Sequence, residues 1–78
     1  MTAGVKRRYA MVRASMMGSV SYIQRSTGST VEAGDTIMAV EAMKLISSIT
    51  APLSGEVEVL VSVGEMVAAD QVVAKIYV

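Results

Sequence analysis

Hydrophobic and polar residues alternate along short segments of the chain, a period of two that is typical of strands with one buried face. Val57-Glu58-Val59 shows the alternation directly, and similar segments rich in Val, Ile, Thr and Ser lie between breaks that contain Gly. The predicted strands cover residues 9–14, 20–24, 36–42, 45–51, 55–60 and 71–77, with short bridges near 30–31 and 66–67. Ala-rich stretches are too short for a stable helix. We therefore expect an all-β fold with little or no helix.

The chain also repeats itself. At a shift of 36, residues 26–37 lie over residues 62–73, and upstream, residues 14–20 lie over residues 51–57 at a shift of 37. Each half reads as a bend, a strand, a turn with Gly28 or Gly64, a short apolar step and a closing strand. Glycine suits such turns because it adopts positive φ without a Cβ penalty. Two halves with one plan predict a β-sandwich with a pseudo-twofold internal repeat.

The length and composition of the chain limit the classes of protein to which it can belong. A length of 78 residues suits one compact domain, and a hydrophobic fraction of 53% argues against disorder. We expect a flexible N-terminus over residues 1–8, with a solvated Lys6-Arg7-Arg8 run, and one domain over residues 9–78. The formal net charge is zero, and the three tyrosines are scattered. Binding to nucleic acid or to a membrane surface is therefore not expected.

The absence of Cys and His from the sequence excludes disulfides, thiolate catalysis, histidine bases and the usual zinc ligand sets. No metal site and no independent catalytic centre are expected. The apolar runs are far shorter than the roughly 20 residues of a membrane helix, and no export signal follows the basic run. We expect a cytoplasmic location, or an organelle matrix if the chain is cut from a longer one.

The segment that joins the two halves is unusual. Residues 40–46 must reverse direction for the halves to pair, yet they contain no Gly, Asn, Asp or Pro. Two-residue hairpin turns usually recruit Asn-Gly or a similar pair because positive φ is needed there. Met43-Lys44 at such a turn accepts local strain, and departures of this kind are expected at functional sites.

Glu41-Ala42-Met43-Lys44-Leu45 closely resembles the Glu-Ala-Met-Lys-Met attachment motif of biotinyl domains, the biotin carboxyl carrier family. The resemblance covers residues 9–78 and extends to the flanking pattern. That pattern comprises Gly18, Gly28, Val31 and Gly34 before the lysine, and Ala51, Pro52, Gly55 and Gly64 after it. Two departures are Leu45, where the family has Met, and Ser15-Met16, where many members have Pro-Met. Leu for Met conserves bulk and apolarity.

The resemblance implies a flattened barrel-sandwich of two four-stranded antiparallel sheets with the modified lysine on a hairpin tip. It implies that a biotin protein ligase attaches biotin covalently to Lys44 and inspects Glu41, Ala42, Met43 and Leu45. The biotin would carry a carboxyl group from a biotin carboxylase site to a carboxyltransferase site. The domain would be a non-catalytic part of a biotin-dependent carboxylase.

Other interpretations stay open at this point. A lipoyl carrier domain has the same fold and repeat, but it usually shows Asp-Lys-Ala, whereas Met43 and Leu45 flank the lysine here. An unmodified structural domain of this fold, as in efflux-pump components, usually has a long helical insertion between the halves, which this chain lacks. Glu41 as a general base for Lys44 is a minor alternative.

Overall fold

The computed structural model describes residues 7–78, which form eight strands and no helix. The strands are β1 (Tyr9–Arg13), β2 (Gly18–Ile23), β3 (Thr30–Val31), β4 (Thr36–Ala42), β5 (Leu45–Thr50), β6 (Gly55–Val59), β7 (Met66–Val67) and β8 (Val72–Tyr77). The predicted all-β class is confirmed, and the strand bounds agree with the prediction to within two residues. Residues 7–78 include no helix long and apolar enough to cross a membrane.

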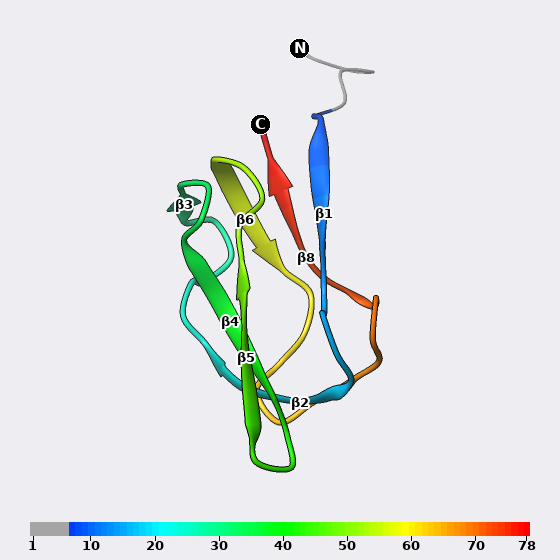
Figure 1. The fold of residues 1–78 in the computed structure, drawn as a ribbon. Helices are drawn as coiled ribbons and strands as arrows, with labels where there is room; N and C mark the ends of the chain where they lie inside the picture. The colour runs from blue at the N-terminus through cyan, green and yellow to red at the C-terminus, as the bar shows by residue number, and fades with distance from the viewer. Residues whose placement is uncertain (1–6) are drawn as a thin grey trace.

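Two four-stranded sheets form the layers of the molecule, with strand orders β1-β8-β6-β3 and β5-β4-β2-β7 (Figure 1). Every pairing is antiparallel. The edge strands β1 and β5 approach each other without a shared ladder, so the barrel stays open along this seam. The predicted flattened sandwich of two four-stranded sheets is confirmed. The β4–β5 turn lies at one end of the molecule, and the ends of the described chain, residues 7 and 78, lie at the other (Figure 1).

The repeat in the sequence appears as a pseudo-twofold relation between the sheets. Replacing β1, β2, β3 and β4 by β5, β6, β7 and β8 converts one strand order into the other. The hydrogen bonds follow the same rule: the Gly28 N–H donates to the Val57 carbonyl, and the Gly64 N–H donates to the Val20 carbonyl, both at 2.8 Å. The predicted internal repeat is therefore confirmed.

The core lies between the two sheets and obeys the same symmetry. Its buried side chains include four pairs related by the repeat: Val20 with Val57, Val31 with Val67, Ile37 with Val73, and Val40 with Ile76. Full burial of such a side chain contributes about 1.5–3 kcal/mol. No polar or charged side chain within residues 7–78 is buried. The alternating pattern thus gives each sheet one apolar inner face.

The turn glycines divide into two kinds. Gly28 and Gly64 have φ of 94° and 89°, as expected of glycines at tight turns. Gly18 and Gly55 do not have positive φ; they are the first residues of β2 and β6. A Cβ at Gly18 would collide with the Glu41 carbonyl oxygen. The reason for glycine there is close backbone approach, which differs from the positive φ required of glycine at the turns.

The predicted flexible N-terminus, residues 1–8, falls mostly outside the described residues, which include neither Lys6 nor the five residues before it. Arg7 forms an ion pair with Glu56 at 2.8 Å and lies 4.9 Å from the ring centroid of Tyr77. The Arg8 carbonyl accepts a hydrogen bond from the Val78 N–H at 3.0 Å. Arg7 and Arg8 therefore lie against the sheet beside β8.

Candidate functional site at the β4–β5 turn

The turn between β4 and β5 contains only two residues. Ala42 pairs with Leu45, which leaves Met43 and Lys44 as the loop. Met43 has φ of 56°, whereas Lys44 does not have positive φ. These signs are those of a type II′ turn, whose first central position favours glycine. A side chain in this position costs on the order of 1–3 kcal/mol, so the strain predicted for Met43-Lys44 is present at Met43.

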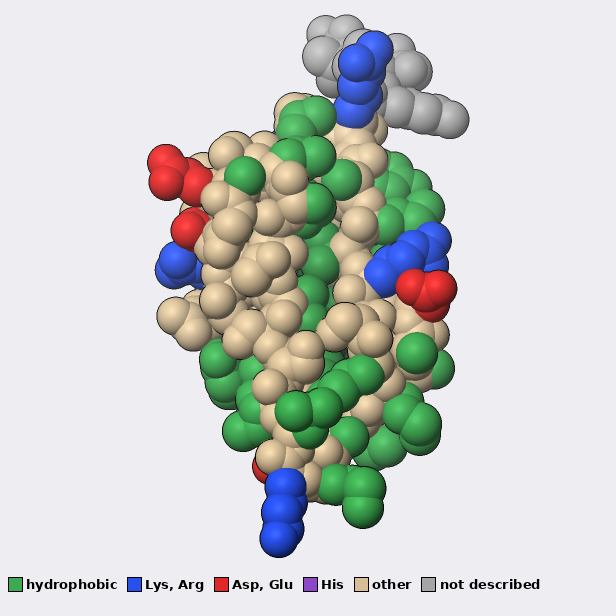
Figure 2. Space-filling view, in the orientation of Figure 1, with side chains coloured by type: hydrophobic (Ala, Val, Ile, Leu, Met, Phe, Trp, Pro, Cys, Tyr) green, Lys and Arg blue, Asp and Glu red, His purple; other side chains and the backbone are tan. Residues whose placement is uncertain are grey.

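Apolar side chains at the turn face solvent. Met43 is 97% exposed and Leu45 is 62% exposed, although both are large and hydrophobic. Lys44 between them is exposed as well. In Figure 2 a basic side chain projects at the end of the molecule where this turn lies, with hydrophobic side chains nearby. Met43 fills no core, and exposed apolar residues grouped around a single amine suggest a surface that contacts another molecule.

The Lys44 amine forms no hydrogen bond or ion pair with the described part of the chain. The hydrogen bonds and ion pairs among residues 7–78 do not include its amine, and they do not include the Glu41 carboxylate. Glu41 is exposed and lies opposite Ile46 in the β4–β5 ladder. The structure therefore shows no pairing of Glu41 with Lys44 of the kind that a general base requires. The amine is free to react with an activated group brought from outside.

The predicted site residues are brought together, and two further residues join them. Glu41, Ala42 and Leu45 are the strand residues adjoining the Met43-Lys44 loop, and only Ala42 among these five residues is partly buried. Met17 and Met66 line a groove together with Met43. They were missed in the sequence because they are distant along the chain. The one available signal was the unusual number of methionines, seven in 78 residues.

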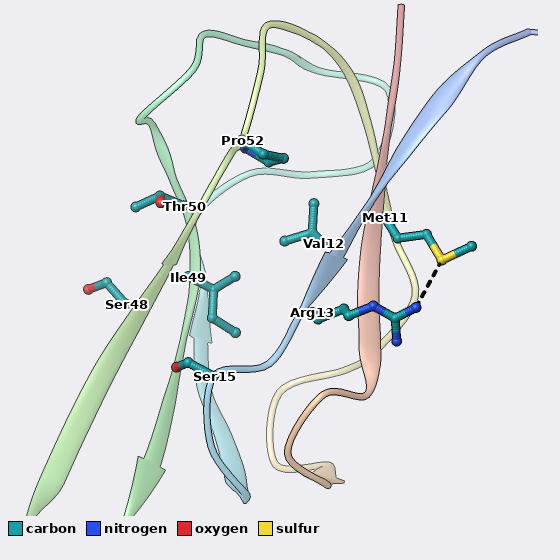
Figure 3. A pocket seen from close by; sticks show the side chains of 8 residues that line it. All are labelled: Met11, Val12, Arg13, Ser15, Ser48, Ile49, Thr50 and Pro52. Carbon is teal, nitrogen blue, oxygen red and sulfur yellow. Dashed lines mark hydrogen bonds between the residues drawn. The ribbon is translucent and has the colours of Figure 1, made fainter.

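A second hollow, of about 260 Å³, lies along the seam between β1 and β5, and it carries little chemistry (Figure 3). Among its lining residues, Arg13 is the one with a charged side chain. The Arg13 guanidinium donates to the Asp70 carbonyl at 2.8 Å and lies 3.4 Å from the Met11 sulfur. Within residues 7–78, no three Asp, Glu, His or Cys side chains are grouped in a way that could hold a metal ion. The β4–β5 turn is therefore the stronger candidate.

A two-layer β domain with a lysine on an exposed, strained hairpin has the architecture of a carrier domain. A family model described as "Biotin-requiring enzyme", for the biotin and lipoyl attachment domain, matches residues 10–76. The chain belongs to this family of attachment domains, and it is a non-catalytic domain. The family resemblance inferred from the motif around Lys44 is thereby confirmed.

Two solved carboxylase structures contain a region similar to this chain. The crystal structure of urea carboxylase from Kluyveromyces lactis matches 97% of this chain with 30% identity and a TM-score of 0.83. A single-chain, multi-domain long-chain acyl-CoA carboxylase matches 95% of this chain with 26% identity and a TM-score of 0.76. The matched regions are 7% and 8% of those chains. This chain thus spans less than a tenth of either similar protein.

Proposed function

We propose that Lys44 carries biotin and that the domain presents it to the active sites of a biotin-dependent carboxylase. The observation that carries this proposal is the exposed, unpaired amine of Lys44 on a two-residue turn in a chain of the biotin and lipoyl family. In the attachment reaction, the amine nitrogen would bond to the carbonyl carbon of an activated biotin, and the activating group would leave. The new amide is neutral, so the formal net charge would change from zero to minus one.

The chain's own contribution is position. When bound, biotin accepts a carboxyl group on its ureido nitrogen and releases it to an acceptor. Tethering raises the effective concentration of the attached group at both partner sites, provided that the geometry allows it to reach them. The paired strands β4 and β5 hold the turn at one end of the molecule (Figure 1). The partners would be a biotin carboxylase and a carboxyltransferase, in the cytoplasm or an organelle matrix as expected from the sequence.

Two observations favour biotin over lipoate. The residues beside the lysine are Met43 and Leu45, and neither is the acidic or small residue that is usual in lipoyl domains. Both similar structures described above are carboxylases by name. An unmodified structural role is less favoured because a purely structural turn has no need of a free amine and would be more stable with glycine in place of Met43.

We infer that a biotin protein ligase reads the side chains around the lysine. Met43 and Leu45 offer exposed apolar area, Glu41 offers an exposed carboxylate, and Ala42 lets the ligase approach the backbone closely. Met43→Gln keeps the length of the side chain and removes its apolar character. It is expected to slow biotin attachment severalfold while leaving the fold intact.

A competition experiment tests the identity of the attached group. The protein is incubated with a biotin ligase, a lipoate ligase and both acids, and its intact mass is then measured. The expected result is a mass gain of one biotinyl group. A mass gain of one lipoyl group would contradict the proposal. If the folded protein gains no mass, the experiment is repeated with Leu45→Met, which completes the family motif. Absence of modification in that variant as well would also contradict the proposal.

A further inference from the structure

A groove lies next to the lysine turn, on the sheet formed by β5, β4, β2 and β7. It encloses about 500 Å³, within the range of about 300–1,000 Å³ typical of small-molecule sites. Its walls are mostly apolar: Met17 comes from the β1–β2 connection, Met66 from β7, and Met43 from the turn itself. Met17 and Met66 are 63% and 64% exposed. Three methionines thus face solvent around one hollow instead of filling the core.

Two polar side chains in the same groove are positioned by strand register. Ser19 on β2 is paired with Glu41 on β4 and with Met66 on β7, so the three residues form one row across the sheet. The hydrogen bonds and ion pairs among residues 7–78 use neither the Ser19 hydroxyl nor the Glu41 carboxylate. The groove therefore offers a free acceptor and a free donor beside flexible, polarizable thioethers, which adapt to varied ligand shapes.

We propose that this groove holds the ring of the biotin attached to Lys44 of the same chain whenever that biotin is outside a partner's active site. The inference rests on the proposed function. The biotin ring combines an apolar thioether side with a ureido edge that has two N–H donors and one carbonyl acceptor. Met17 and Met66 match the apolar side, the Glu41 carboxylate accepts from a ureido N–H, and the Ser19 hydroxyl donates to the ureido carbonyl.

The tether favours this occupant over any free ligand. Met43 lines the groove and directly precedes Lys44 in the sequence, so a ring attached to Lys44 is held close to the edge of the groove. A short flexible link gives an effective concentration in the millimolar range. An intrinsic dissociation constant of about 1 mM would then leave the ring docked roughly half of the time. Such weak docking would shield the ring from solvent between transfers. It would also let the ring leave the groove for a partner site that binds it more tightly.

The test uses the full chain labelled with ¹³C at the methionine methyl groups. NMR spectra are recorded before and after biotin attachment, once intact mass has shown complete modification. A sample without the mass gain would count against the proposed attachment function, whereas a fully modified sample tests the groove alone. The expected result is that the Met17 and Met66 methyl signals shift and show contacts to biotin ring protons. Met11 is an exposed control on the other sheet, and its signal is expected not to move.

A pair of matched variants checks the assignment. In Met66→Gln, the contact between the Met17 methyl and the ring is expected to be lost, whereas in Met11→Gln it is expected to persist. Both residues are exposed, so neither substitution disturbs the core. Unchanged Met17 and Met66 signals in the fully modified protein would overturn the proposal. Shifts that grow with protein concentration would also overturn it, because they would place a second copy of the chain on the groove.

Discussion

Two residues related by the repeat adopt the same backbone conformation with different side chains. Gly34 has φ of 92°, and Asp70, at the equivalent place in the second half, has φ of 71°. Both donate the backbone N–H to an equivalent carbonyl, Gly34 to Ala51 and Asp70 to Ala14. Asp tolerates this region better than most residues because its side chain can hydrogen-bond locally.

Gly34→Ala isolates the cost of positive φ, because a Cβ at Gly34 would meet no atom within 4 Å. We expect the free energy of unfolding to fall by about 1–2 kcal/mol. Asp70→Gly should raise the free energy of unfolding, by less than Gly34→Ala lowers it. Glycine relieves the strain of positive φ at this position, but it loses more conformational entropy on folding. Urea denaturation measures both. A Gly34→Ala change within a few tenths of a kcal/mol would contradict the account.

Tyr77 gives a prediction that depends on pH. A hydrogen bond of 2.7 Å from its hydroxyl to the Glu58 carboxylate raises the pKa of Tyr77 above its ordinary value of 10.0. The protonated phenol is the form favoured by folding, so its contribution to stability is fully present below the unfolded value. The contribution is lost as the pH rises through the higher folded value.

The titration is followed by tyrosinate absorbance. Glu58→Gln removes the carboxylate and should bring the Tyr77 pKa back toward 10.0. Tyr77→Phe removes the Tyr77 signal and thereby identifies its part of the absorbance curve. An unchanged titration curve in Glu58→Gln would show that the hydrogen bond does not control this group. Attachment at Lys44 should not change, because Tyr77 lies at the opposite end of the molecule.

At the scale of elements, Gly18 and Gly55 let β2 and β6 start in close contact with β4 and β8. A Cβ at Gly55 would collide with the Tyr77 carbonyl oxygen and lie 2.8 Å from the Ile76 Cγ2 atom. Because backbone cannot move aside as a flexible side chain can, we expect Gly55→Ala to destabilise the fold by roughly 2–3 kcal/mol.

That loss should exceed the loss caused by Gly34→Ala when both are measured by urea denaturation. The difference separates close approach from positive φ as the reason for glycine. Gly55 also lies far from the β4–β5 turn, so the folded fraction of Gly55→Ala should accept biotin at the normal rate. A cost for Gly55→Ala no larger than that for Gly34→Ala would show that β6 and β8 can separate without penalty.

Most of the strands could be predicted because local alternation and the repeat agree with the tertiary packing. The prediction placed β3, β4 and β7 at their observed bounds. For β2, the prediction began at residue 20, whereas the observed strand begins at Gly18. Pairing with β7 and close contact with β4 extend the strand through this glycine, which the local sequence pattern treats as a break. Such long-range contacts leave no periodic trace in the sequence.

The site was predictable in part for the same reason. The motif around Lys44 is contiguous, so the sequence indicated the turn and its neighbours directly. Met17 and Met66 join the site only because β7 pairs with β2, and Met66 is 49 positions from Met17 in the sequence. The strand register and the open hollow beside the turn were needed to connect them.

At the scale of the whole molecule, the proposed attachment site and the ends of the described chain lie far apart. The turn with Lys44 lies at one end, and the ends of the described chain lie at the other (Figure 1). In the similar carboxylases the matched region is less than a tenth of the chain. A domain joined to a longer protein from the end opposite the turn keeps its lysine clear of the connecting segments.

The central claim is that Lys44 is the one attachment point for biotin, and intact mass spectrometry after reaction with a biotin ligase tests it most directly. The chain has three lysines, Lys6, Lys44 and Lys75, so each can be replaced by Arg in turn without changing the charge. We predict a gain of one biotinyl group in the unaltered protein, in Lys6→Arg and in Lys75→Arg, and no gain in Lys44→Arg. A biotinyl gain that persists in folded Lys44→Arg would contradict the account.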